Sequence, residues 1–370
     1  MSITKKNRNV SKAPFGGLGA ALFINGIGCI SPQRTFNNAE FLPDVKEYTT
    51  NRMVCVDADY SKFFDAGSIR RMGRLMKYGT AAGLIALRDA GITAPGAIST
   101  GTGLGLPEVS QKFLKSLIEV EETIVSPSTF IQSTHNTVSS NIALLCGCYA
   151  HNNTFSHKGF SFESALIDAR LLAQENTDNI LVGAYDEVSD YKYAAMKKTN
   201  ELRAEPFSNL DIYGKNSNGI IAGEGGAFFV LAKQKTDNTY GTFVGNKTIY
   251  KPQGIAEIKT AIQLFLEENN LLLADIDVVI SGINGDAKND EIFIELNKNI
   301  FAAQTILAYK NLCGEYMTSS AFAFWLASQI MKTQQIPAVA ILENRNRTPK
   351  NILLYTSHRH NHSLMLFKAI

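Results

Sequence analysis

The sequence predicts a layered α/β fold made of two successive halves. Short apolar runs of strand length alternate with longer segments in which apolar residues recur at helical spacing. The alternation starts again beyond residues 233–241, a polar and turn-like stretch, and the 370 residues exceed the roughly 100–200 typical of one domain. We therefore expect an N-terminal half over 20–235 and a shorter C-terminal half over 236–370, preceded by a basic, then glycine-rich arm over 1–19.

The elements of the first half follow from their spacing and their end signals. A strand is expected over 20–31, where an apolar run ends in Ser31-Pro32. A helix is expected over 68–91, because apolar residues recur there at helical spacing and Gly91 stands where a helix-ending glycine would. The same criteria predict strands over 97–99, 153–156, 179–184 and 226–232, and helices that end near 122 and that span 139–148 and 160–175.

The second half is expected to follow the same pattern of alternating elements. It contains no short-period repeat and no low-complexity tract. Its predicted helices span 254–268, about 290–298 and 319–332, and its predicted strands span 278–281, 337–342, 351–356 and 363–367.

Composition and charge exclude several classes of protein. Hydrophobic residues make up 45% and charged residues 19%, which argues against disorder and coiled coils. The net charge of +2 gives no general attraction to nucleic acid or to an anionic membrane. The apolar segment over 321–331 is far shorter than the roughly 20 residues of a membrane span, and we expect neither membrane insertion nor secretion. Five scattered cysteines without a CxxC pair argue against disulfides and a zinc site, so we expect a cytoplasmic protein.

Five motifs in order carry a resemblance to a known family. They are Asn25-Gly-Ile-Gly28, the helix from Arg70 to Gly91, Thr100-Gly-Thr-Gly-Leu-Gly105, Gly183-Ala-Tyr-Asp-Glu187 and Ala222-Gly-Glu-Gly-Gly-Ala227. In residue type and spacing they resemble the β-ketoacyl synthases. The resemblance spans most of residues 20–368 and implies a thiolase-like, five-layered fold of two pseudo-repeated α/β halves, with mixed sheets and helices between them.

The glycines at 101, 103 and 105 also invite a phosphate-binding interpretation. Glycines after a strand can bring backbone N–H groups close to a pyrophosphate. The spacing here is GxGxG instead of GxGxxG, and no acidic residue stands where a ribose would need it. We therefore interpret the segment as a tight turn and expect no cofactor.

The family's nucleophile is missing. β-Ketoacyl synthases need a cysteine thiolate at a helix N-terminus to carry the acyl chain. In the family this cysteine precedes an Ala-Leu pair by six residues and a serine by two. Here Ala165-Leu166 and Ser161 keep that frame, and the nucleophile position is Gly159. A substitute is not obvious, since Cys146 and Cys148 are expected to be buried small hydrophobes and His157 to be a surface or turn residue.

The two histidines that stabilise the family's enolate are also replaced. In the region of the first histidine the chain reads Ile283-Asn284, with Asn289-Asp290 of the following motif retained. An asparagine amide can donate a hydrogen bond but cannot shuttle a proton. The position of the second histidine, after Lys310 and Gly314, holds Glu315. An ionised carboxylate would oppose an oxyanion instead of stabilising it.

A fourth element, the family's glycine-rich Gly-Phe-Gly-Gly turn, is replaced by a histidine-rich segment. The chain reads Ser357-His-Arg-His-Asn-His362 at this place, including His358. Alternating histidines allow a zinc site in principle. Since no acidic or cysteine partner lies nearby in sequence, we interpret the segment as a polar surface loop and expect no metal.

These departures are typical of a chain length factor, the non-condensing subunit that pairs with an active ketosynthase. By this resemblance, the expected partners are an active ketosynthase in a heterodimer, or a second copy in a homodimer, and an acyl carrier protein. Strand 153–156 would pair with its counterpart across the twofold axis of the dimer. The dimer would act in a pathway of the polyene, aryl polyene, flexirubin, polyketide or fatty-acid type. Phe160 and Phe162 would line or plug an acyl tunnel, or they pack in the core.

Two alternatives stay open at this point. One is an unorthodox acyltransferase, 3-oxoacyl-carrier-protein synthase or thioester hydrolase that uses His157, Glu315 or a recruited cysteine. The other is a homodimeric binding protein for a hydrophobic acyl ligand. No catalytic residue is expected for a chain length factor, and acyl labelling distinguishes that interpretation from the unorthodox enzyme.

Overall fold

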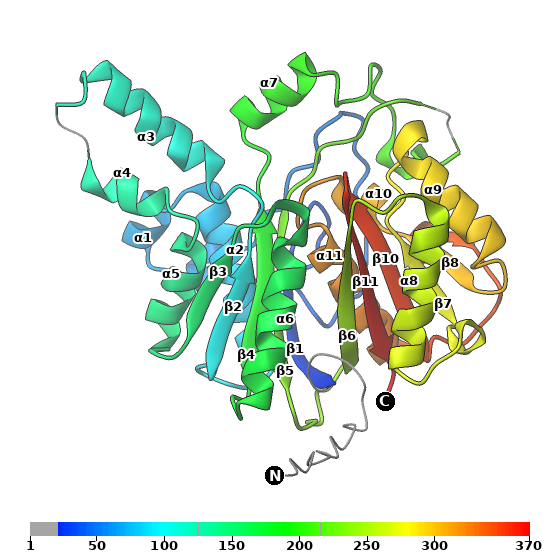
Figure 1. The fold of residues 1–370 in the computed structure, drawn as a ribbon. Helices are drawn as coiled ribbons and strands as arrows, with labels where there is room; N and C mark the ends of the chain where they lie inside the picture. The colour runs from blue at the N-terminus through cyan, green and yellow to red at the C-terminus, as the bar shows by residue number, and fades with distance from the viewer. Residues whose placement is uncertain (1–20, 124–125, 215–216) are drawn as a thin grey trace, which may run out of the picture.

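A computed structural model describes residues 21–123, 126–214 and 217–370. The predicted arm over 1–19 therefore lies outside the described residues. Within them, eleven strands form one mixed sheet (Figure 1). Five strands lie on one side in the order β3 (Asn152–Phe155), β2 (Ala97–Gly101), β4 (Ile180–Asp186), β5 (Gly225–Ala232), β1 (Leu22–Ile30). The sheet continues with β6 (Gly241–Tyr250), β11 (Asn361–Lys368), β10 (Asn351–His358), β7 (Val278–Ser281), β8 (Thr305–Ala308), β9 (Ile341–Glu343).

The strand order repeats, which confirms the predicted pseudo-repeat. The first five strands have the order 3-2-4-5-1, and the strands β6, β7, β8, β10 and β11 have the same order read from the opposite edge. β2 is parallel to β3 and β4, as β7 is parallel to β8 and β10, and the next strand in each set runs antiparallel. The antiparallel pair β1·β6 joins the two sets. The predicted boundary at 235/236 falls in the loop between β5 and β6 and stays our interpretation.

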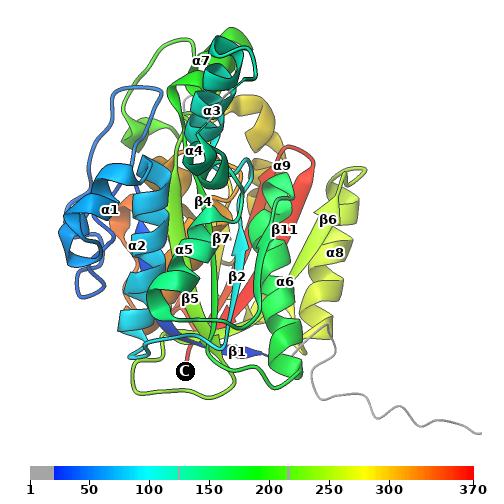
Figure 2. The same ribbon diagram turned by 90° about the vertical axis from the view of Figure 1, so that its left-hand side faces the viewer.

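Helices cover both faces of the sheet and separate its two parts. One buried cluster joins α2 (Arg74–Asp89) and α5 (Thr137–Cys146) to the outer face of the first five strands. Another joins α8 (Ile255–Glu268) and α9 (Ala287–Asn299) to the outer face of the second set. A third cluster places α6 (Ser161–Gln174) and α11 (Ser320–Thr333) between the two parts (Figures 1 and 2). The result is the predicted five-layered arrangement.

Several local predictions need correction. The helix predicted over 68–91 is two helices, α1 (Ala66–Arg71) and α2, because Met72 and Gly73 are extended; Gly91 does end α2 with a φ of +70°. The strand predicted over 337–342 begins as a 3-10 turn and becomes β9 only at Ile341. The elements that the sequence did not predict are short or half-exposed: β6, β8, α4 (Pro127–Gln132), α7 (Asp190–Lys198) and α10 (Lys310–Cys313). None of the helices in the described part of the chain combines the length and apolar character needed to cross a bilayer.

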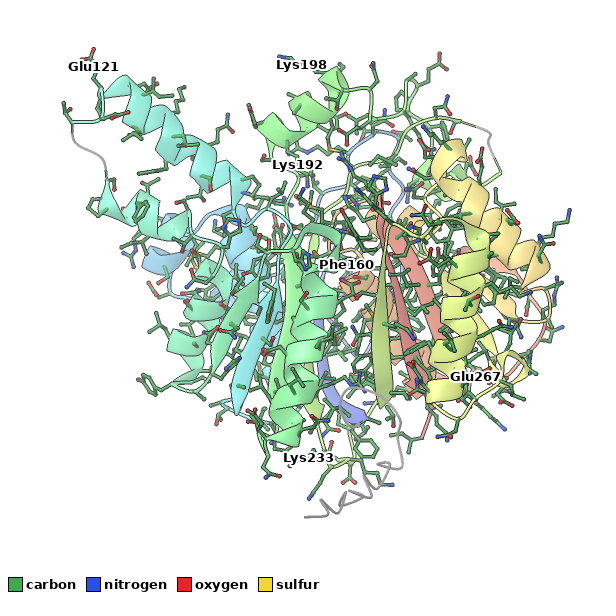
Figure 3. All side chains as sticks on the ribbon, viewed as in Figure 1. Glu121, Phe160, Lys192, Lys198, Lys233 and Glu267 are labelled. Carbon is green, nitrogen blue, oxygen red and sulfur yellow. The ribbon has the colours of Figure 1, made fainter. Side chains whose placement is uncertain are left out.

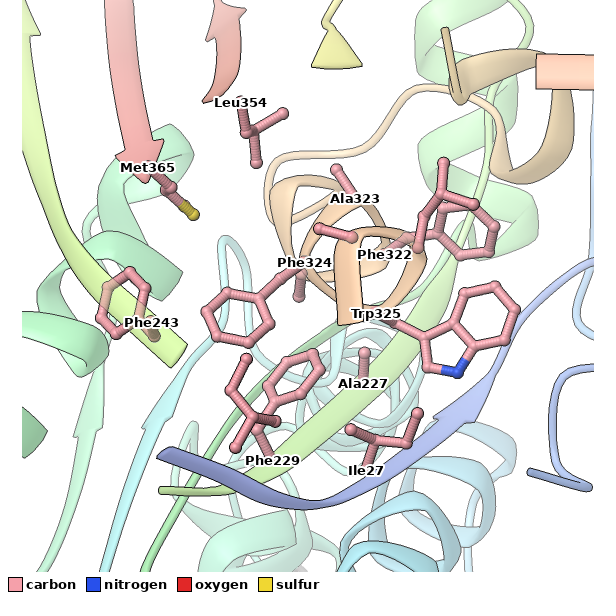
Figure 4. Close-up of a cluster of buried hydrophobic side chains, with 14 of the residues drawn as sticks. Ile27, Ala227, Phe229, Phe243, Phe322, Ala323, Phe324, Trp325, Leu354 and Met365 are labelled. Carbon is pink, nitrogen blue, oxygen red and sulfur yellow. The ribbon is translucent and has the colours of Figure 1, made fainter. Parts of the chain in front are cut away.

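An aromatic cluster in the central layer holds the two halves together (Figure 4). Phe324 of α11 lies at its centre and contacts rings from both halves. Its partners, with centroid distances, are Phe162 (5.7 Å), Phe229 (4.2 Å), Phe243 (5.3 Å) and Phe367 (4.8 Å). Truncation of a buried phenylalanine typically costs about 3–5 kcal/mol. The interior between the two parts of the sheet is therefore filled by side chains that stabilise both halves.

A buried carboxyl on α6 gives the fold a pH dependence. Burial raises the pKa of Glu163 to about 7, although Ser363 donates a hydrogen bond to it at 3.0 Å. A folded pKa above the ordinary 4.5 means that the stability contributed by this group is full below pH ~4.5 and is lost as the pH rises through ~7. We therefore expect Glu163→Gln to be more stable than the parent chain by about 2–3 kcal/mol at pH 8 and equal to it near pH 4.5. Urea unfolding at both pH values tests this, with the exposed Glu175→Gln as control; equal differences at both pH values would contradict it.

Candidate functional site

The predicted nucleophile position lies at the entrance to α6. Gly159 belongs to a short 3-10 turn (Lys158–Phe160) that follows β3 and leads directly into α6, and it is buried. Figure 3 places its neighbour Phe160 at the top of α6. A Cβ atom at residue 159 would lie 2.9 Å from the Cβ atom of His358 and 3.3 Å from that of Asn361. The space for a side chain at this position is therefore occupied by the segment that carries His358.

That segment is a β-hairpin, which corrects the predicted surface loop. β10 and β11 pair as far as His358 and Asn361, and a two-residue turn of Arg359 and His360 connects them, with Arg359 at a φ of +57°. The three histidines point to different places: His358 contacts Glu315, His362 shares a hydrogen bond of 2.8 Å with Tyr355, and His360 is exposed in the turn. In the described ranges, no group of three histidine, cysteine or acidic residues could hold a metal ion.

Glu315 is the centre of a buried polar cluster. One carboxylate oxygen, Oε2, accepts hydrogen bonds from Lys310 Nζ at 2.5 Å and from Asn284 Nδ2 at 2.8 Å. The other oxygen, Oε1, lies 3.3 Å from His358 Nδ1. The structure thus brings together four predicted positions, Asn284, Lys310, Glu315 and His358, and packs His358 against the fifth, Gly159.

The cluster is held in a charged state despite its burial. Burial alone would raise the pKa of Glu315, but the Lys310 ammonium and the hydrogen bond from His358 lower it to about 2. For Lys310, burial acts against the charge, and the neighbouring carboxylate more than offsets it and raises the pKa of the amine. Glu315 and Lys310 therefore form an ion pair whose two side chains are almost fully shielded from solvent.

Asp290, the acidic residue of the retained Asn289-Asp290 motif, holds the loop that carries Asn284. Asp290 accepts hydrogen bonds from the backbone N–H groups of Asn284 at 2.9 Å and Gly285 at 2.7 Å. The side-chain oxygen of Asn284 in turn accepts from the N–H of Asp286 at 3.0 Å. These contacts fix the amide of Asn284 so that its nitrogen faces Glu315.

Two clefts open onto this cluster from the surface. The larger has a volume of about 770 Å³ and the smaller about 200 Å³, and Glu315 and His358 line both. An ion pair between Arg359 and Glu201, at 3.1 Å, also borders both clefts. Because Arg359 is mostly exposed, this pair contributes little to stability. The cluster is thus reachable by a small molecule from two directions.

Comparison with known proteins finds one family over part of the chain and similar folds over most of its length. Residues 107–207 match the family described as the beta-ketoacyl synthase N-terminal domain. The structure of the ishigamide ketosynthase/chain length factor superimposes with a TM-score of 0.78 at 16% identity, covering 95% of this chain and 100% of that chain. A ketosynthase (ApeO) in complex with its chain length factor (ApeC) from Xenorhabdus doucetiae gives a TM-score of 0.76 at 15% identity, covering 95% and 98%. Residues 107–207 thus resemble this family's N-terminal domain, and the chain as a whole has the fold of the ketosynthase structures.

Sequence similarity to curated proteins is more limited. The 3-oxoacyl-[acyl-carrier-protein] synthase 2 of Vibrio cholerae serotype O1 is 24% identical over 203 residues, which is 50% of this chain and 49% of that protein. The corresponding Vibrio harveyi enzyme is 23% identical over 205 residues. The match thus spans about half the length of these curated relatives. The predicted thiolase-like fold is confirmed by the structural matches.

The thiols of the described residues are not arranged as nucleophiles. Cys29, Cys55, Cys148 and Cys313 are buried and Cys146 is half-buried. Burial raises the pKa of Cys29, Cys55, Cys146 and Cys313 above the ordinary value for a thiol. Cys313, which stands two residues before Glu315, is fully buried and points its sulfur at the carbonyl of Gly314 at 3.3 Å. A recruited cysteine nucleophile therefore gains no support.

The remaining predicted site residues lie around the entrance to α6. His157 is exposed, and its ring stands edge-on to that of Phe160 with the centroids 5.6 Å apart. Phe162 is fully buried in the aromatic cluster, as the core interpretation expects. Neither Phe160 nor Phe162 lines the two clefts at Glu315. A tunnel-lining role stays a prediction for both rings.

The close contact at Gly159 gives a direct test of the filled nucleophile position. We expect Gly159→Ala to lower the free energy of unfolding by about 1–3 kcal/mol, because the added methyl group displaces the hairpin at His358. Gly226 is the matched control, since its added Cβ would meet nothing closer than 3.4 Å. Urea unfolding of both variants measures the difference. Equal stability of Gly159→Ala and Gly226→Ala would show that the position is open.

Proposed function

We propose that this chain is a non-condensing ketosynthase-like subunit, similar to a chain length factor. It pairs with an active β-ketoacyl synthase and acts on chains bound to an acyl carrier protein. The observation that carries the proposal is the cluster itself. Position 159 has no side chain and is packed against His358, while a Glu315–Lys310 ion pair occupies the place where the family resemblance puts its second histidine. Such an arrangement supplies no acyl-carrying thiolate, and it places an ionised carboxylate where the family's second histidine would stabilise the enolate oxygen.

An unpaired sheet edge supports the pairing. β3 is the outermost strand on its side, and its outer edge has no strand partner among the described residues. An exposed edge strand is a template for pairing with another chain. On the adjacent helix α5, Leu144 is 77% exposed and Leu145 50%, and Tyr149 beyond the helix is 96% exposed. Large apolar side chains grouped beside a free edge favour a protein interface at this face.

A second apolar surface lies on the same side of the molecule. α3 (Pro107–Glu119) and α4 form an arm that projects at the upper left of Figure 1 and faces the viewer in Figure 2. The rings of Phe113 and Phe130 pack against each other with centroids 5.5 Å apart. The exposed apolar residues of the arm are Leu114, Ile118, Phe130 and Ile131. In a dimer built on β3, this arm would contact the partner and shape its acyl site.

The names of similar structures support a proposal for the substrate class. Two are complexes of a ketosynthase with a chain length factor, and another is described as a type II PKS acyl-carrier protein in complex with its ketosynthase bound to the hexaketide. The Vibrio relatives are 3-oxoacyl-[acyl-carrier-protein] synthases. We therefore propose carrier-bound chains of the polyene, polyketide or fatty-acid type as the material on which the assembled pair acts.

Co-expression with a ketosynthase encoded beside this chain tests the proposal. The expected result is a complex of one copy of each chain, measured by size-exclusion chromatography with light scattering. The ketosynthase should depend on this chain for its full product length. A chain that is monomeric or a stable homodimer, and that binds no such ketosynthase, would overturn the proposal.

A further inference from the structure

His358 lies in the site, on a strand that stands where the resemblance predicts a glycine-rich turn. His358 lies at the end of β10 and lines both clefts, and its side chain is 19% exposed. Its Nδ1 atom faces the carboxylate of Glu315, and its Nε2 atom makes no hydrogen bond with any described residue. One ring nitrogen is thus bound to a buried carboxylate and the other is free at the cleft.

The carboxylate determines which nitrogen carries the proton. An ionised Glu315 can only accept hydrogen bonds, so the neutral imidazole places its proton on Nδ1 and its lone pair on Nε2. The carboxylate itself cannot rotate freely, because Lys310 and Asn284 hold its other oxygen. A base oriented by a carboxylate that is fixed in turn is the arrangement used for general base catalysis.

A hydrogen-bond donor lies next to this base. The amide oxygen of Asn284 is used by the N–H of Asp286, and one of its two N–H bonds is used by Glu315. The second N–H bond of the amide is left over on a residue that lines the larger cleft. Because Asn284 and His358 bind the two oxygens of one carboxylate, the donor and the base lie side by side.

The two clefts fit an extended, uncharged thioester. They meet at His358, so a molecule whose carbonyl carbon lies there can extend one arm into each cleft. The smaller cleft is lined by Ala195, Met196 and Met317, which suits an acyl chain. Besides Glu315, the larger cleft has four carboxylates and two cations. This excess of negative charge disfavours a thioester whose thiol part carries a polyphosphate. These charged residues are Glu201, Asp286, Glu291, Glu295, Lys288 and Arg359.

We infer that His358 is a general base for the hydrolysis of acyl thioesters in this cleft, with Asn284 as the donor to the carbonyl oxygen and Glu315 as a positioning residue. A water molecule gives a proton to Nε2 of His358 as its oxygen forms a bond to the acyl carbon. The C–S bond then breaks, and the proton passes from His358 to the departing thiolate. The products are a carboxylic acid and a thiol. This activity goes beyond the proposed pairing and does not depend on it.

Release of thiol from hexanoyl-N-acetylcysteamine by the purified full chain tests the inference. We expect turnover above the buffer rate, and we expect His358→Gln to lower the rate by about 10²–10⁴-fold. His360→Gln is the matched control, because that histidine is exposed in the same hairpin turn and lines neither cleft. In His358→Ala, added imidazole should restore part of the rate, which a purely structural role of His358 would not produce.

Two results would overturn the inference: a parent chain no faster than buffer, or a His358→Gln variant as fast as the parent. If His358→Gln proves unstable, absence of imidazole rescue in His358→Ala overturns it equally. Chromatography of the same variants with the partner ketosynthase separates the two proposals. Loss of hydrolysis in a variant that still binds the ketosynthase supports the role of His358 and leaves the proposed pairing unaffected. A parent chain that does not bind the ketosynthase contradicts the proposed pairing and leaves the hydrolysis inference unaffected.

Discussion

Replacement of Leu144 by aspartate is expected to weaken binding to the partner ketosynthase by about 10–100-fold. Leu144 is largely exposed on α5, next to the free edge of β3. A charge at this position would have to be desolvated in the interface, and truncation at the centre of an interface typically costs 2 kcal/mol or more. Titration of the labelled partner with the parent and variant chains measures the change in Kd.

The matched control is an exposed leucine on the opposite side of the molecule. Leu264 of α8 is 48% exposed, and its helix covers the outer face of the other half. Leu264→Asp should bind the partner as the parent does. Both variants should unfold within about 0.5 kcal/mol of the parent, because each residue is on the surface. If Leu144→Asp binds as tightly as Leu264→Asp, the interface does not lie at β3 and α5.

Replacement of Lys310 by methionine is expected to destabilise the fold by about 3–5 kcal/mol. The substitution leaves the carboxylate of Glu315 buried without its cation, and an uncompensated buried charge is among the costliest single changes. The double variant Lys310→Met with Glu315→Gln should recover most of this loss, because it removes both charges and keeps hydrogen-bonding groups at position 315. Urea unfolding of the two variants at pH 7 measures both effects.

The same pair predicts an acid dependence. Glu315 has a folded pKa of about 2, below the ordinary 4.5, so its contribution to stability is present above pH ~4.5 and is lost as the pH falls from ~4.5 to ~2. The difference between the parent and Lys310→Met should therefore shrink over that range. A single variant as stable as the double variant at pH 7 would show that the ion pair is not held as described.

Much of the fold is predictable because its signals are local. The strand over 278–281 and the helix over 254–268 are apolar runs with clear period and length, and both occur within a residue of where they were predicted. β8 is only four residues long, and half of the side chains of β6 are exposed or half-exposed, so neither gives a strong pattern. The pairing of β1 with β6 joins distant segments and leaves no local signal.

The site is predictable in its positions and not in its contacts. The spacing of motifs identified Gly159, Asn284 and Glu315, and the structure brings these residues to one place with Lys310 and His358. The hairpin that replaces the expected loop was not predicted, because its register depends on pairing between β10 and β11. The direction of His358 depends on that register, as a shift of one residue would place it on the other face. The alternating histidines after the predicted strand over 351–356 were the available signal that this strand continues to His358.

Intact-protein mass spectrometry of the purified complex tests directly whether this chain carries an acyl group. The complex is incubated with an acyl thioester donor, and each chain is weighed. We expect an acyl adduct on the proposed partner ketosynthase and an unchanged mass for this chain, since its site presents no thiol. A stable acyl adduct on this chain, removed by exchange of one of its cysteines, would contradict its non-condensing role.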